Sequence, residues 1–241
     1  MSDRFVPLGV LVAEGALDRE LAAHLLVLLD AGVPLVVAGL ERSARERVAD
    51  ALAAASPVPI GGEEAWVGPS AAFAWLADPA GVGCTAPGAG SAPRSPKATR
   101  VRARGLLDAA VPEAPDPAST RTLVRSLVRG FPLIADAAAV DLADLLARLR
   151  ATPVRVPEDD LHRLGVVLLL DGTPPRASAV HLLRPPLSGL RRPPALLGAR
   201  DPDSGTWDAF AWAAIPELAE RCGVPHATYA ALLGECSALL G

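Results

Sequence analysis

The chain of 241 residues has one lysine, Lys97, and only 4% aromatic residues. Arginine supplies every other basic side chain, so chemistry that needs a compact ammonium group can come only from that one position. Because aromatic side chains are scarce, the core must be built from Leu, Val and Ala, as in parallel sheets covered on both faces. This composition favours an α/β protein.

Cysteine pairs and long apolar runs are missing as well. The cysteines Cys84, Cys222 and Cys236 are odd in number and form neither a CxxC pair nor a metal-ligand spacing. No 18 consecutive residues are apolar, and the first residues carry acidic side chains within a mixed sequence. These features predict a cytoplasmic protein with reduced thiols, no export signal and no membrane span.

The net charge of −4 includes no long basic stretch, which argues against a broad surface for nucleic acid or anionic lipid. The four histidines, His24, His162, His181 and His226, lie on separate segments without triad or metal spacing. We expect them to be packing or surface residues. Nucleic acid is therefore not an expected partner, and no metal site is predicted.

Strand-like and helical segments alternate along most of the chain. Apolar residues recur at helical spacing over 17–30, a short apolar run follows at 35–38, and a second helical stretch covers 44–55. Ser119 and Asp141 are predicted to cap later helices that end at Arg129 and Arg150. Further strand-like runs lie at 106–107, 131–135 and 166–170. Repeated strand–helix units predict a mainly parallel sheet.

The last part of the chain changes character. Turn signals separate strand-like stretches at 177–183, 195–200 and 206–211, which predicts an antiparallel β extension, and two helices follow at 216–222 and 226–240. We divide the chain into a core over 1–186 and a C-terminal β-hairpin and helical extension over 187–241, packed on that core. A Gly/Pro/Ala/Ser-rich segment at 78–99 is expected to be a flexible surface loop.

The segment 35–55 has the plan of a phosphate loop, which needs a buried strand, then GxxxxGK[ST], then a helix. With Gly39 as the first glycine, Ser43 falls inside the loop, Ala44 replaces the second glycine, Arg45 replaces the lysine and Glu46 replaces the Mg²⁺-binding hydroxyl. Arg45 keeps a positive charge but has a different shape from an ammonium. These five residues form a predicted but degenerate phosphate site.

The substitutions weaken that site in two ways. Ala44 adds a Cβ where a phosphate loop favours positive φ, at a cost of roughly 1 kcal/mol. Glu46 removes the metal ligand, and at about 5 Å with an effective dielectric of ~20 its carboxylate repels each unit of phosphate charge by roughly 3 kcal/mol. ATP and Mg²⁺ are therefore expected ligands only if the divergent site still binds them.

Taken together, the chain resembles the ATPase domain of the type II/type IV secretion and type IV pilus motor family. The resemblance covers 17–55 and 119–240 in order, including LDRELAAHLLVLLDAGVPLVVAG before the loop and LVRGFPLIADAAAVDLADLLARLR at the family's His box. It implies a RecA-like P-loop NTPase core. Ala138 falls where the family has its histidine, and Asp108, after Leu106-Leu107, is the candidate for the Walker B acid, although a turn or cap residue explains it too.

Two other arrangements compete with this interpretation. Arg121, Arg125 and Arg129 repeat along one helix face and could reach a neighbouring nucleotide as arginine fingers, but a solvated face explains the same spacing. The helix pair 216–240 resembles a DNA-reading helix-turn-helix, but its second helix has no arginine or lysine to contact phosphates.

The leading hypothesis from sequence is a catalytically inactive pseudo-ATPase with a structural or regulatory role. Its expected partner is a protein, either an active motor paralogue or a second copy of the chain. One alternative is a divergent ATPase in which Arg45 serves for lysine. Another is a DNA-binding regulator that uses the C-terminal helix pair.

Overall fold

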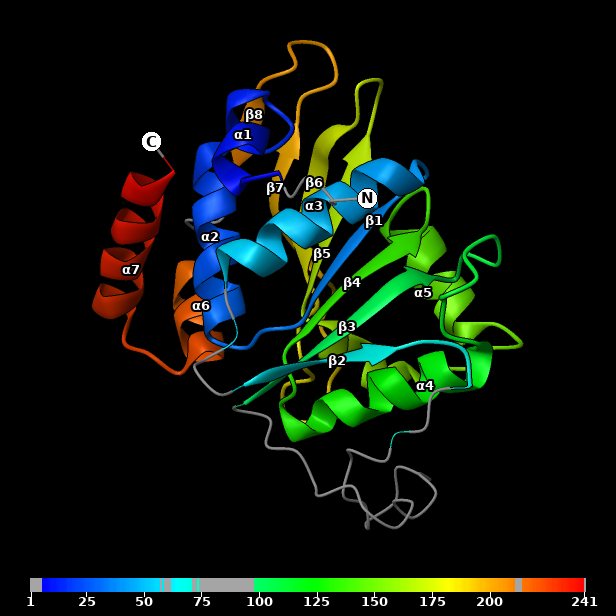
Figure 1. Cartoon of the computed structure of the whole chain (residues 1–241). Coiled ribbons are helices and arrows are strands. Elements are labelled where there is room, and N and C mark those ends of the chain that lie inside the picture. Colours follow the sequence, from blue (N-terminus) through cyan, green and yellow to red (C-terminus); the bar gives the residue numbers. More distant parts are fainter. Residues whose placement is uncertain are drawn as a thin grey trace.

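Eight strands form one mixed sheet within the part of the chain that the computed structural model describes, which comprises residues 6–56, 58, 62–70, 73, 98–210 and 214–240. The strand order is β2-β3-β4-β1-β5-β6-β7-β8 (Figure 1). Neighbours from β2 to β5 pair in parallel, and β6, β7 and β8 continue in antiparallel pairs. The strands are Leu35–Gly39 (β1), Glu63–Val67 (β2), Thr99–Leu106 (β3), Leu133–Ala138 (β4), Val166–Asp171 (β5), Arg176–Leu182 (β6), Ala195–Arg200 (β7) and Trp207–Ala209 (β8).

Helices cover both faces of this sheet (Figure 1). One layer contains α1, α2, α3, α6 and α7, and the other contains α4, α5 and the 3₁₀ segment η2. The helices are Leu8–Ala13 (α1), Arg19–Asp30 (α2), Arg42–Ala55 (α3), Pro117–Ser126 (α4), Leu142–Arg150 (α5), Ile215–Cys222 (α6) and His226–Leu239 (α7), with 3₁₀ segments at Leu127–Arg129 (η1) and Glu158–Leu164 (η2).

The central strand β1 shows why both layers are needed. All five of its residues are buried, and successive side chains point to opposite faces of the sheet. Leu35 and Val37 enter the core on the α2 and α3 side, whereas Val36 and Ala38 enter the core on the α4 and α5 side. The apolar run at 35–38 therefore has no polar face, as expected of a strand in a parallel sheet.

The predicted α/β class, the mainly parallel sheet, its antiparallel extension and the C-terminal helices are all confirmed. Strand β7 pairs directly with β6, so the segment from 187 onward continues the same sheet. The helix α1 was not predicted from sequence. Ser119 was predicted to cap the helix α4, but the cap is Asp116. The Asp116 carboxylate accepts a hydrogen bond from the backbone N–H of Ser119. Most of the predicted loop 78–99 lies outside the described residues, but Thr99 begins β3.

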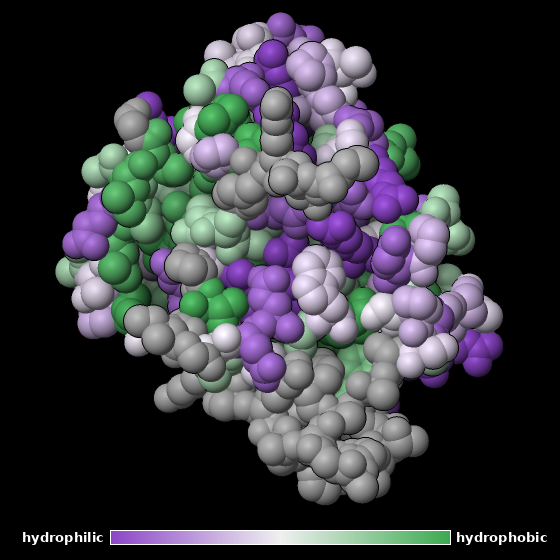
Figure 2. All heavy atoms as spheres, viewed as in Figure 1, coloured by the Kyte–Doolittle hydropathy of each residue, from purple (hydrophilic) through white to green (hydrophobic). Residues whose placement is uncertain are grey.

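Helix α7 is attached to the core through α2. The Tyr229 hydroxyl is 2.8 Å from His24 Nδ1, and both residues are buried. The outer side of α7 is apolar too, with Leu232 and Leu239 exposed, and apolar side chains gather at its position on the surface (Figure 2). None of the described helices is both long and apolar enough to cross a membrane.

Candidate functional site

The connection from β1 to α3 is shorter than a phosphate loop. Strand β1 ends at Gly39 and α3 begins at Arg42, which leaves only Leu40 and Glu41 between them. Ser43 was predicted to lie in the loop and the helix to begin at Ala44, but α3 begins two residues earlier, so Ser43 lies within its first turn. Because Ala44 is helical, the predicted cost of a positive φ does not arise. A two-residue link cannot form the nest of successive amides that cradles phosphates.

Local sequence explains why the helix starts early. Arg42 and Glu46 are four residues apart, and Arg42 Nε donates to Glu46 Oε1 at 2.7 Å. Such i,i+4 pairs stabilise the first turns of a helix. The hydroxyl of Ser43 donates to the Glu41 carboxylate, within the same link and first turn. The glycine that would interrupt the helix in a phosphate loop is absent, since that position is Ala44.

Arg45 is completely buried, with no exposed side-chain area. Its Nη2 is 2.7 Å from Asp108 Oδ2 and its Nε is 3.3 Å from Asp136 Oδ2. Its Nη1 donates to the carbonyl oxygens of Gly39 and Leu40, both at 2.9 Å. One guanidinium thus joins the end of β1, the end of β3 and the middle of β4, at the carboxyl edge of the parallel strands.

Asp136 is the partner that sequence reasoning missed. It is 1% exposed and lies inside β4, whereas the predicted strand stopped at Ala135. Burial raises the pKa of Asp136, and a hydrogen bond from the Gly105 backbone and the charge of Arg45 act in the opposite direction. A single acid within an apolar strand is a usable sequence signal for a buried ion pair, since an unpaired carboxylate there would be strongly destabilising.

The residues do not fit a nucleoside triphosphate. The carbonyl oxygens of Gly39 and Leu40 face the site, so the link presents acceptors where phosphate binding needs backbone N–H donors. The guanidinium of Arg45 lies between this link and the two acids, Asp108 and Asp136. Gly39 has a different use, because a Cβ there would lie 2.9 Å from the Leu170 carbonyl oxygen of the neighbouring strand. The absence of a side chain at Gly39 therefore allows β5 to lie close to the end of β1.

No protein-family model matches this chain, and a search of curated proteins found no match. The site is therefore interpreted from its own geometry.

An open cleft lies beside Asp108, at the same edge of the sheet. Its volume is about 480 Å³, and it is lined mainly by small apolar residues between the β3–α4 loop and the end of α5. Its charged groups are already engaged: Asp116 caps α4, and Arg148 donates to the carbonyls of Ala138 and Leu107. Ala138, at the predicted His-box position, contributes only this backbone oxygen.

The remaining sequence candidates do not converge. His24 is packed against Tyr229, and burial lowers the pKa of His162 and of His181. Arg125 lies 3.9 Å from Asp160, on the α4 face that was considered for arginine fingers. Across the described ranges, no group of three or more His, Cys, Asp or Glu side chains could hold a metal ion. Lys97 lies outside the described residues.

Proposed function

We propose that this chain is a P-loop-derived, RecA-like subunit related to secretion and pilus motors, and that it has a structural or regulatory role without ATP hydrolysis. The observation that carries the proposal is the ion pair between Arg45 and Asp108. In a P-loop ATPase the loop lysine and the Walker B acid converge on the nucleotide phosphates and Mg²⁺. Here the residues at the corresponding positions of the resemblance also converge, but they bind each other.

Electrostatics explains why this arrangement disfavours nucleotide. The single positive charge of Arg45 faces two carboxylates, Asp108 and Asp136, and two carbonyl oxygens. A phosphate group brought to about 5 Å would meet net negative charge, and at an effective dielectric of ~20 each uncompensated unit costs roughly 3 kcal/mol. Freeing Arg45 to face the phosphate would leave two carboxylates without their partner.

Titration with a fluorescent ATP analogue in the presence of Mg²⁺ tests the proposal. We expect no saturable binding up to millimolar nucleotide and no phosphate release. Tight, Mg²⁺-dependent binding with turnover would contradict it and support a divergent ATPase. In that case Arg45→Ala should abolish turnover, whereas Arg47→Ala, which removes an exposed arginine two positions along the same helix, should not.

The exposed apolar side of α7 supports a protein partner, since contiguous apolar surface marks interaction sites on soluble proteins. The partner is either an active motor paralogue or a second copy. Light scattering over a concentration series distinguishes them. A dimer that Leu239→Glu dissociates supports self-association, and a monomer at all concentrations excludes it. Leu40→Glu, at an exposed leucine far from α7 in sequence, is the matched control.

A further inference from the structure

A cleft at the opposite end of the sheet gathers arginine side chains. We call it the arginine cleft. It lies between the loop after β6, η2 and the end of α5, near the start of β5, whereas Arg45 lies at the carboxyl edge of the parallel strands. Its volume of about 90 Å³ is well below the roughly 300 Å³ or more of a typical small-molecule pocket. It has room for a single small group. Residues that line it include Arg150, Glu158, Asp159, His162, Arg184 and Arg192.

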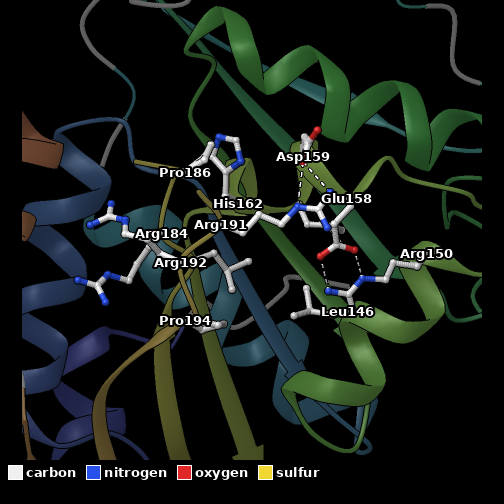
Figure 3. Close-up of a pocket in the computed structure, with 12 residues that line it drawn as sticks. Leu146, Arg150, Glu158, Asp159, His162, Arg184, Pro186, Arg191, Arg192 and Pro194 are labelled. Carbon is white, nitrogen blue, oxygen red and sulfur yellow. Dashed lines mark hydrogen bonds and ion pairs between the residues drawn. The ribbon is translucent and has the colours of Figure 1, made fainter. Parts of the chain in front are cut away.

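One wall of the arginine cleft is electrically balanced. Arg150 binds Glu158 through two nitrogens, with Nη2 2.7 Å from Oε1. Arg191 binds Asp159, with Nη2 2.9 Å from Oδ1. These two pairs lie together on one side of the view in Figure 3. Each positive charge on this wall has its own carboxylate, so the wall does not attract an additional anion.

The other wall has an excess of positive charge. Arg184 and Arg192 extend together to the opposite side of the view (Figure 3), and both bind the carboxylate of Glu217 in α6, at 2.8 and 3.0 Å. Arg221, one turn further along α6, makes a hydrogen bond from Nη2 to the His162 carbonyl at 3.3 Å. Arg184 and Arg192 therefore share one carboxylate, and Arg221 adds a third positive charge near them, on a protein whose net charge is −4.

Burial and neighbouring positive charges raise the free-energy cost of keeping Arg221 charged. Burial lowers the pKa of Arg221, and the nearby charge of Arg192 lowers it further, while Glu217 opposes both effects. Burial also lowers the pKa of His162, and the charges of Arg163 and Arg221 act in the same direction, while Asp160 opposes them. Partly desolvated guanidinium groups bind planar or tetrahedral oxyanions through their fork of N–H donors. The His162 imidazole adds a further hydrogen-bonding group to the lining of the cleft.

We propose that the arginine cleft binds an oxyanion, namely a phosphate or carboxylate group, held by Arg184 and Arg192 beside His162, with the charge of Arg221 nearby. The group could belong to a free small molecule or to an acidic side chain of a protein partner. Both sources supply the same chemistry. The site is separate from Arg45, so its occupancy does not depend on the proposed loss of nucleotide binding.

Calorimetric titration at constant ionic strength tests this proposal with three probes: pyrophosphate, citrate and a hexaglutamate peptide. We expect saturable one-to-one binding of at least one probe, weakened at least tenfold by Arg192→Gln and by Arg184→Gln, which both change residues that line the cleft. Arg176→Gln is the matched control, since it removes one exposed arginine at the other end of β6. Circular dichroism establishes that each variant is folded, and two variants guard against the misfolding of one.

The pattern of binding identifies the source of the oxyanion. Preference for pyrophosphate or citrate indicates a free small molecule, and preference for hexaglutamate indicates an acidic protein segment. If none of the three probes bound more tightly than chloride does, the proposal would be overturned. Equal weakening by Arg176→Gln would overturn it too, because the binding would then follow overall charge. Neither result would bear on Arg45, whose test is nucleotide titration.

Discussion

At the scale of single residues, Arg45 has a structural role at the carboxyl edge of the parallel strands. Its guanidinium satisfies two acids and two carbonyls from three strands and their connections. Transfer of an ion pair into the interior costs about as much as the pair gains, so the arrangement need not add net stability. Removal of one partner is different, because it leaves the other charges buried and unpaired.

We therefore expect Arg45→Met to destabilise the fold by about 3–5 kcal/mol. The substitution removes the positive charge that pairs with buried Asp136 and with partly exposed Asp108. Adding Asp136→Asn should recover part of that loss, because a neutral amide removes the buried charge while it keeps the volume. Urea unfolding of the single and double variants measures both effects. If Arg45→Met unfolded at the wild-type midpoint, the ion pair would not be the structural element described.

His24 predicts a pH dependence of stability. Burial lowers its pKa to about 4, against 6.5 in the unfolded chain. Between these values the unfolded state binds a proton that the folded state does not, so stability is complete above pH 6.5 and falls as the pH is lowered. The loss approaches about 3 kcal/mol near pH 4.

Urea unfolding at pH 7 and pH 4.5 measures this loss. The variant His24→Leu/Tyr229→Phe removes both polar partners, so neither atom is left unsatisfied. We expect a smaller loss in this variant than in the wild type. Burial also lowers the pKa of His162 and of His181, so these residues add to the loss of stability in both proteins. The contribution of His24 is therefore the difference between the loss in the wild type and the loss in the variant. An unchanged loss would show that His24 does not titrate as described.

At the scale of elements, strong local signals predicted structure and weak ones did not. The runs at 35–38 and 166–170 became β1 and β5, and the Asp141 side chain caps α5 as expected. Helix α1 was missed because it has only six residues and no side-chain cap. The cap of α4 moved to Asp116, because Pro117 suits the first helical position after it.

The candidate site was predicted in part. Gly39, Arg45 and Asp108 do lie together, because the pattern of strand, link and helix places residues at the carboxyl edge of the sheet. Two features were beyond local sequence reasoning. The length of the link depends on where the helix begins, and the contact of Arg45 with Asp136 joins residues 91 positions apart. Such contacts follow from strand order, which periodicity alone does not reveal.

Gly165 joins η2 to β5 at a point where its backbone lies close to Pro34, just before β1. It has φ +69°, and a Cβ there would lie 2.4 Å from the Pro34 carbonyl oxygen. We expect Gly165→Ala to cost about 3 kcal/mol or more, from backbone strain and overpacking together. Gly223→Ala is the control, since Gly223 has φ +68° with open space around it, and should cost only about 1 kcal/mol. Equal losses in urea unfolding would contradict the packing argument.

At the scale of the whole molecule, the antiparallel extension and the parallel strands share one core. Leu197 of β7, Leu218 of α6 and Tyr229 of α7 belong to the same buried cluster as the leucines of α2. Every residue of α2 from Leu21 to Leu29 is buried. A helix that is apolar on all sides must be covered on all sides. The C-terminal helices supply part of that cover.

We therefore expect a fragment of residues 1–186 to lack a cooperative unfolding transition, because it would expose one side of α2 and leave β6 as an unpaired edge. The control is the full chain cut by a protease at a site inserted after Gly189, in the exposed turn between Leu187 and Leu190. The nicked protein keeps every contact and should unfold near the wild-type urea midpoint. A fragment that unfolds as cooperatively as the nicked chain would mean that the parallel strands and their helices are stable alone. The segment from 187 onward would then contribute little to the stability of the rest of the protein.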